Sequence, residues 1–266
     1  MQQASVPADH HTASFDWRSR LRAAGIHLGL SALVAAASAV LVFAIWYPFP
    51  YSEISAGREL FLIVVAVDVV LGPLITFAVF DRRKPRKELR RDLAVVGLLQ
   101  LAGLAYGLWA VNLARPVHLV YELDRFRVVH QVEIPEELLD RTPPGVTAIP
   151  LGGPTLLSLR PFASEQERVA FTTAALAGVH LSARPDLWQP YEAGRERIRA
   201  SAKPVAQLKA RFPDRVAEID AALRKAAVEP AQAAYLPLIA RKADAWTVLL
   251  DARNAQVIGF VPLDSF

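Results

Sequence analysis

The sequence has 266 residues, of which 53% are hydrophobic, and its mean hydropathy of +0.25 exceeds that of a typical soluble globular protein. The formal net charge of +4 comes mostly from residues 1–114, which carry 11 basic and 8 acidic side chains beside apolar segments. These basic residues are better interpreted as membrane-topology signals than as a nucleic-acid surface, so no nucleic-acid partner is expected. The absence of cysteine excludes disulfides, thiol catalysis, cysteine-ligated zinc and iron–sulfur clusters.

The first apolar segment predicts a transmembrane helix over about 24–47, preceded by a polar tail at 1–22. About 20 apolar residues at 1.5 Å each cross a hydrocarbon core of roughly 30 Å. A cleaved signal peptide is the alternative, because Ala37-Ser38-Ala39 has the small residues of a cleavage site. The apolar run continues past that site, which favours a retained helix.

Two further apolar segments predict helices over about 59–80 and 93–113, which complete a transmembrane domain over 23–114. Seven of the twelve residues in the loop 81–92 are basic, whereas the loop 48–59 carries a single arginine. The positive-inside rule therefore predicts a cytoplasmic N-terminus and a cytoplasmic basic loop. Everything after the third helix is predicted to lie outside the cytoplasm, as a periplasmic domain over 115–266.

Asp68 is the most informative residue of the membrane half, because a carboxylate within a membrane helix is costly unless it is protonated or paired. Counting along the neighbouring helices puts Ser38 and Tyr106 at a similar depth, so a polar, helix-contacting cluster of these three residues is geometrically feasible. Asp68 then serves in a proton relay, recognises another transmembrane helix, or simply locks the three helices together. The sequence leaves these alternatives open.

Gly72 and Pro73 follow in the same helix. Proline removes a backbone hydrogen bond and glycine weakens the turn, which predicts a kink there. The kink either acts as a hinge or simply lets the helix pack within the bundle, and nothing in the sequence decides between the two.

Residues 115–266 predict an α+β domain, because strand-like runs lie near both of its ends with helices between them. Ser164 and Glu167 have the spacing of a capping box and open an alanine-rich helix that ends near Gly178. An amphipathic helix is expected within 205–228, with Pro213 in its first turn. The expected strands and short helices are 117–121, 127–132, 156–159, 191–200, 246–250 and 256–261.

The sequence shows none of the common catalytic or cofactor motifs, including the nucleophile elbow, the zincin helix, the P-loop and the dinucleotide-binding fingerprint. His118 and His130 lie on expected strands and could meet across a sheet, but a structural role is favoured for both. Intramembrane aspartyl proteolysis requires two carboxylates, and the membrane segments offer only Asp68. We therefore expect no enzyme activity, no metal and no cofactor.

Several motifs in order resemble type IV pilin accessory proteins of the TfpX/TfpZ type. The resemblance is dense from Gly25 to about Val132 and thinner beyond. The motifs that carry it are Gly25-Ile26-His27-Leu28, Trp46-Tyr47-Pro48, Val67-Asp68-Val69-Val70-Leu71-Gly72-Pro73-Leu74, Arg91-Asp92-Leu93-Ala94-Val95, Gln100-Leu101-Ala102, Ala105-Tyr106-Gly107, Arg115-Pro116, Asp124-Arg125-Phe126, Val248-Leu249-Leu250-Asp251 and Gly259-Phe260-Val261-Pro262-Leu263-Asp264.

The resemblance implies a non-enzymatic, multi-pass protein of the bacterial inner membrane that assists assembly, stability or surface display of a type IV pilin. Its implied partners are a major pilin and the pilus assembly machinery, besides membrane lipid. Such a pilin sits in the membrane as one helix that carries a periplasmic globular domain. The alternative is a membrane-anchored periplasmic ligand-binding protein of the sensor type, although only a short tail and a short loop would lie in the cytoplasm. A membrane enzyme with an unrecognised site is the third possibility.

Overall fold

The computed structural model describes residues 16–176, 178–240 and 245–266. The chain divides into two compact units. The first, here called the helical unit, comprises the described residues up to Ala36 together with Val64–Ala105. The second, here called the sheet unit, comprises Ala37–Ile63 and Tyr106–Phe266.

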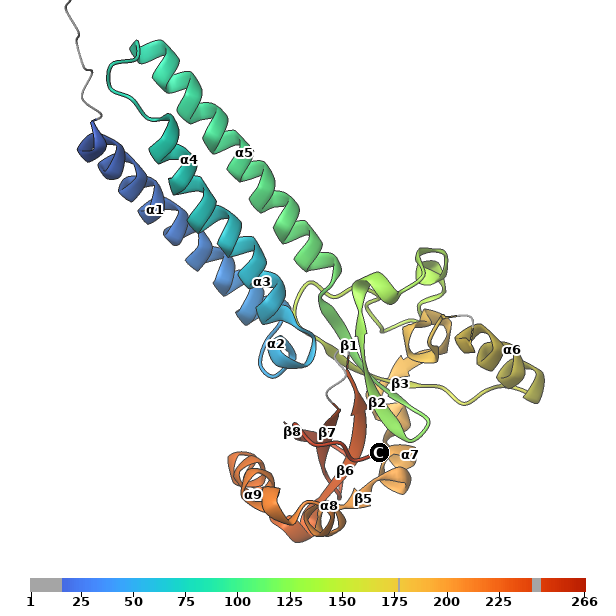
Figure 1. The fold of residues 1–266 in the computed structure, drawn as a ribbon. Coiled ribbons are helices and arrows are strands. Elements are labelled where there is room, and N and C mark those ends of the chain that lie inside the picture. The colour runs from blue at the N-terminus through green and yellow to red at the C-terminus, as the bar shows by residue number, and fades with distance from the viewer. Residues whose placement is uncertain (1–15, 177, 241–244) are drawn as a thin grey trace, which may run out of the picture. The chain divides into compact units, whose positions relative to one another are not determined.

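Three long apolar helical segments run through the first half of the chain, as the sequence predicts, and they lie side by side within the helical unit (Figure 1). Each is long and apolar enough to cross a membrane. Two of them contain a π-helical stretch. The segments consist of α1 (Trp17–Val40) with η1 (Leu41–Trp46), then α3 (Gly57–Ala66) with η2 (Val67–Leu71) and α4 (Gly72–Val79), then α5 (Arg86–Leu113).

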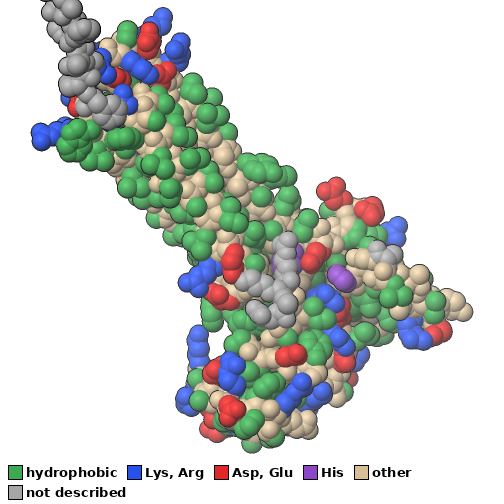
Figure 2. All heavy atoms as spheres, viewed as in Figure 1, with side chains coloured by type: hydrophobic (Ala, Val, Ile, Leu, Met, Phe, Trp, Pro, Cys, Tyr) green, Lys and Arg blue, Asp and Glu red, His purple; other side chains and the backbone are tan. Residues whose placement is uncertain are grey.

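The outer surface of these helices is strongly apolar. Figure 2 shows hydrophobic side chains over much of their visible surface, with charged side chains gathered at the end that carries the loop 81–92. Leu33 is 69% exposed and Leu98 is 70% exposed. Exposing a continuous apolar surface of this kind to water is energetically unfavourable, whereas exposing it to lipid is not.

The charged end of the helical unit is closed by a short polar network. The Arg20 guanidinium donates hydrogen bonds to the carbonyl oxygens of Phe77 and Ala78, at 3.2 and 2.7 Å, and forms an ion pair with Asp81. The last carbonyls of a helix have no partner within the helix and attract a cation. Arg20 therefore stabilises the end of α4 from a neighbouring helix.

The sheet unit is built on one mixed sheet, whose strand order is β4-β3-β1-β2-β6-β7-β8, with β5 paired to β6. The β1–β3 and β2–β6 pairs are parallel, and the other pairs are antiparallel. The strands are β1 (Pro116–Glu122), β2 (Arg125–His130), β3 (Thr155–Leu159), β4 (Trp188–Pro190), β5 (Lys203–Pro204), β6 (Ala233–Ile239), β7 (Trp246–Asp251) and β8 (Val257–Val261). Together with its helices, this sheet confirms the α+β class predicted for the second half.

The longer helices of the sheet unit are α6 (Glu165–Leu176), α7 (Arg195–Ser201), α8 (Val205–Arg211) and α9 (Val216–Lys225). α6 begins as the capping motif predicts, since the Glu167 amide donates to the Ser164 hydroxyl oxygen at 3.1 Å. The amphipathic segment 205–228 is two helices and not one. Pro213 begins the short turn η8 (Pro213–Arg215) that leads directly into α9, so the proline lies at the start of the amphipathic helix, as the sequence predicts. The expected stripe is nevertheless present on α9, where Ile219 and Leu223 are fully buried against the sheet.

The connection between the first two long helices belongs to the sheet unit and contributes to its core. The short helix α2 (Tyr51–Ile54) places Tyr51 and Ile54 in a buried cluster with residues of β1, β2, β6 and β7. The Tyr51 ring packs edge-on against Phe260, with the ring centroids 5.6 Å apart. The sequence predicted only a short external loop here, because four residues are too few for an apolar period to be recognised.

We expect Ile54→Ala to lower the free energy of unfolding of the sheet unit by about 2–5 kcal/mol, because it empties a fully buried site. The readout is the urea midpoint for protease resistance of the full chain in detergent micelles. Leu151→Ala, at a position that is 86% exposed, is the control and should change stability by less than about 0.5 kcal/mol. Equal midpoints for the two variants would show that α2 is not part of the core.

Candidate functional site

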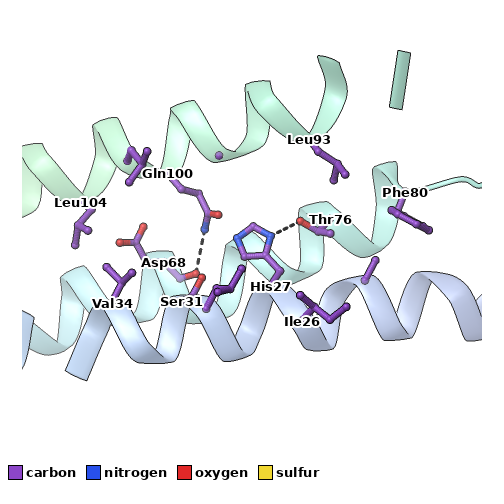
Figure 3. Close-up of a pocket in the computed structure, with 14 residues that line it drawn as sticks. Ile26, His27, Ser31, Val34, Asp68, Thr76, Phe80, Leu93, Gln100 and Leu104 are labelled. Atoms are coloured by element: carbon purple, nitrogen blue, oxygen red, sulfur yellow. Dashed lines mark hydrogen bonds between the residues drawn. The ribbon is translucent and has the colours of Figure 1, made fainter. Parts of the chain in front are cut away.

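A cavity of about 500 Å³ lies among the three helical segments of the helical unit (Figure 3). Apolar side chains and glycine form most of its wall. Its polar lining residues are His27, Ser31, Asp68, Thr76 and Gln100, which come from all three segments. Polar groups in a membrane-spanning bundle are costly and usually face its interior, so this cavity is the candidate functional site.

The backbone at Asp68 explains why Gln100 enters the cavity. Asp68 lies in the π-helical stretch η2, in which each carbonyl accepts from the amide five residues ahead. For Asp68 that residue is Pro73, which has no amide hydrogen. The side-chain amide of Gln100 donates to the Asp68 carbonyl oxygen instead, at 3.0 Å. A side chain of α5 thus satisfies the backbone group that proline leaves unpaired, as a membrane interior requires.

Gly72 provides the space for this hydrogen bond. A Cβ atom placed on Gly72 would lie 1.7 Å from the Gln100 amide nitrogen, so any larger residue has to displace the Gln100 side chain. Gly72, Pro73 and Gln100 therefore act together. The proline leaves the Asp68 carbonyl unpaired, the glycine leaves space for the Gln100 side chain, and the Gln100 amide donates the hydrogen bond.

His27 and Thr76 form a second polar contact across the cavity wall, between α1 and α4. The His27 Nδ1 atom is hydrogen-bonded to the Thr76 hydroxyl (Figure 3). Thr76 is only 2% exposed. This bond pairs the Thr76 hydroxyl with one ring nitrogen of His27 and fixes the orientation of the imidazole.

The carboxyl group of Asp68 is different, because one of its oxygens has no hydrogen-bond partner among the described residues. The residue is 8% exposed, and its Oδ1 atom is buried without a hydrogen-bond partner among the described residues. Figure 3 shows the carboxyl group in the space between Val34 of α1 and Leu104 of α5. An unpaired buried carboxyl oxygen costs free energy that a donor from outside the chain would recover.

Ser38 and Tyr106 do not line this cavity. Ser38 is 7% exposed near the end of α1, whereas Tyr106 is 68% exposed and packs against Trp109 with ring centroids 5.7 Å apart. Asp68 instead shares the cavity with His27, Thr76 and Gln100. A functional cluster of Asp68 with Ser38 and Tyr106 stays a prediction, as does a hinge at Gly72 and Pro73.

Sequence reasoning missed the role of Gln100, although a signal was present. A proline within a membrane helix leaves an acceptor that some neighbouring donor has to satisfy. Gln100 is an uncharged amide donor near the middle of α5. Matching side-chain donors to unpaired backbone acceptors would have predicted a contact between the second and third segments at Gln100.

His118 and His130 of the sheet unit are both buried and hydrogen-bonded within it. His118 is fully buried, with Nδ1 bonded to the Thr155 hydroxyl at 2.7 Å and Nε2 to the Ala148 carbonyl at 2.9 Å. Burial, assisted by the charge of Arg115, lowers the pKa of the His118 imidazole to about 4, so the ring is neutral at physiological pH. His130 contacts Glu133 at 3.3 Å. Across the described ranges, no three His, Asp or Glu residues are grouped to hold a metal ion.

Three membrane-length apolar helices, joined to a mixed-sheet α+β unit, define a class of membrane-associated protein. Comparison with known proteins gives the family. The profile of the fimbrial assembly protein FimB matches residues 15–56. The fimbrial assembly protein of serogroup I from Dichelobacter nodosus is 36% identical over 244 residues, which are 91% of this chain and 94% of that protein.

Two further relatives from the same organism agree with this assignment. The fimbrial assembly protein of serogroup E1 is 35% identical over 91% of this chain and 94% of its own length. The protein of serogroups C1 and C2 is 42% identical over 45% of this chain and 88% of its own length. No solved structure matches the chain. The chain belongs to the family of fimbrial assembly proteins, which confirms the resemblance seen in the sequence.

We expect Gln100→Leu and Gly72→Ala each to destabilise the helical unit by about 0.5–2 kcal/mol, because each removes the hydrogen bond to the Asp68 carbonyl. The double variant should cost clearly less than the sum of the two, since both changes remove the same bond. The measurement is unfolding of the full chain by dodecyl sulfate in mixed micelles.

Gly103→Ala is the matched control for this cycle, because a Cβ atom there meets nothing within 4 Å. It should change stability by less than about 0.5 kcal/mol and should be additive with Gln100→Leu. Additivity of Gly72→Ala with Gln100→Leu would contradict the proposed coupling.

Proposed function

We propose that this chain is a non-enzymatic accessory factor of the bacterial inner membrane that assists assembly, stability or surface display of a type IV pilin. The observation that carries the proposal is the relationship to curated fimbrial assembly proteins, which extends over 91% of the chain at 36% identity. An alignment of that length includes both the helical segments and the sheet unit. The shared part is therefore the whole arrangement and not only a membrane anchor.

The proposed topology places the loop 81–92 in the cytoplasm and the sheet unit in the periplasm. The charge asymmetry of the two ends of the helices supports this direction, because basic loops are retained on the cytoplasmic side. Trp109, which is 55% exposed on α5, is suited to the opposite interface, where amphipathic rings prefer to lie. A periplasmic sheet unit would face the compartment in which pilin globular domains are displayed before assembly.

The proposed partner is the pilin itself, with the pilus assembly machinery as a further contact. A pilin waiting in the membrane offers a transmembrane helix and a globular domain. The helices of this chain supply packing surfaces for the former, and the sheet unit supplies a surface for the latter.

Deletion of the gene tests the proposal, with pilin quantified at the cell surface and in whole cells. We expect surface fibres to fall by about tenfold or more and to return when the full chain is supplied in trans. The pilin should also co-purify with the tagged chain. The amount of an unrelated inner-membrane protein in the same strain controls for general damage to the envelope.

Normal fibre assembly in the deletion strain would overturn the proposal. A strain that assembles fibres normally but no longer responds to an external ligand would favour the alternative, a membrane-anchored periplasmic sensor-like protein.

A further inference from the structure

The cavity of the helical unit has the dimensions of a docking groove for a helix. Its lining residues extend from Ala23 to Val34 on α1 and from Leu93 to Leu104 on α5. At 1.5 Å per residue, each wall is about 17 Å long, or roughly three helical turns. The two walls belong to helices long and apolar enough to cross a membrane, so whatever fills the groove lies at membrane depth.

The polar content of the groove narrows the choice of occupant. His27, Thr76 and Gln100 each make a hydrogen bond within the chain, but the Asp68 Oδ1 atom is buried without a described partner. An acyl chain of a lipid has no hydrogen to donate, and bulk water is absent from the hydrocarbon region. A transmembrane helix that carries a polar donor satisfies the carboxyl group and fills the apolar walls at the same time.

The wall of the groove also leaves room for the backbone of a second helix to approach α5 closely. Gly97 lines it on α5, and a Cβ atom there would meet nothing within 4 Å. Small residues of this kind let the backbones of two membrane helices come near one another. Leu101 and Leu30, at 64% and 61% exposed, provide apolar contact on either side.

A second copy of this chain is a poorer occupant. A two-fold contact through the groove would bring the Asp68 side chains of both copies to the same interface. Each copy would then bring an Asp68 carboxyl oxygen without a described partner to that interface. The interface would then contain two unpaired carboxyl groups instead of one.

We propose that the groove between α1 and α5 binds the transmembrane helix of the fimbrial subunit, and that the Asp68 carboxyl group accepts a hydrogen bond from a polar donor on that helix. This inference rests on the proposed function, which supplies the subunit as partner. It adds the binding site, the orientation of the partner along α1 and α5, and the chemistry of the contact. Gln100 positions the site, because its bond to the Asp68 backbone fixes the π-helical turn that carries the carboxyl group.

Site-specific photocross-linking in living cells tests the groove directly. A photoreactive phenylalanine analogue is placed in the full chain at Leu101, which lines the groove, or at Leu99, which does not, although the two are 64% and 66% exposed on the same helix. Leu30 and Leu33 on α1, at 61% and 69% exposed, form a second matched pair. We expect pilin adducts at Leu101 and Leu30 to exceed those at Leu99 and Leu33 by about tenfold.

Substitution of Asp68 tests the polar contact. With the analogue at Leu101, Asp68→Leu should reduce the pilin adduct by about tenfold, because it removes the acceptor. Asp68→Asn keeps an acceptor oxygen and should retain the adduct within about threefold. Equal amounts of each variant in the membrane fraction control for folding. Loss of the adduct in both variants, or in neither, would overturn the acceptor role of Asp68.

The outcomes separate this proposal from the proposed function. Pilin adducts that form equally at Leu101 and Leu99, adducts of two copies of this chain, or adducts with lipid alone would each overturn the groove as the pilin site. An analogue at Leu151 of the sheet unit provides the comparison. Pilin captured at Leu151 but not in the groove would leave the accessory function standing, whereas normal fibre assembly without the gene would remove both.

Discussion

The structure of the helical unit depends on one requirement, namely that every backbone acceptor within a membrane helix needs a donor. Pro73 removes the donor for the Asp68 carbonyl, and Gln100 of α5 replaces it. The replacement requires Gly72, because any side chain there would occupy the position of the Gln100 amide. Meeting this requirement joins the second and third segments, holds the π-helical turn, and leaves the Asp68 carboxyl group facing a cavity.

In the sheet unit, hydrogen bonds likewise join segments that are far apart in the sequence. The Tyr47 hydroxyl donates to the Val111 carbonyl at 3.0 Å, and the Arg115 guanidinium donates to the Pro150 carbonyl at 2.6 Å and to the Gln131 side chain at 3.1 Å. Tyr51 lies in the core formed by the strands. The connection after the first long helix and the end of the third are therefore structural parts of the sheet unit.

Much of this architecture could be predicted from the sequence because it depends on composition and periodicity. The three long helices follow from apolar length, the hairpin of β7 and β8 from two β-rich runs about a turn, and the start of α6 from its cap. The π-helical turn at Val67–Leu71 and the bond from Gln100 could not be predicted in this way, since they depend on packing between segments 32 residues apart. The same applies to α2, which is too short to show a period. At the candidate site, the sequence identified Asp68 by its charge but not the residues that surround it.

The proposed function requires that the three helices cross a membrane, with the loop 81–92 and the sheet unit on opposite sides. Because the chain has no cysteine, single cysteines report their own location without background. In cells with a permeabilised outer membrane, a membrane-impermeant maleimide should label Leu151→Cys at once and Lys87→Cys only after lysis, while Leu98→Cys on the lipid-facing surface of α5 stays unlabelled in both conditions. Labelling of Lys87→Cys before lysis, or of Leu98→Cys in either condition, would contradict the account.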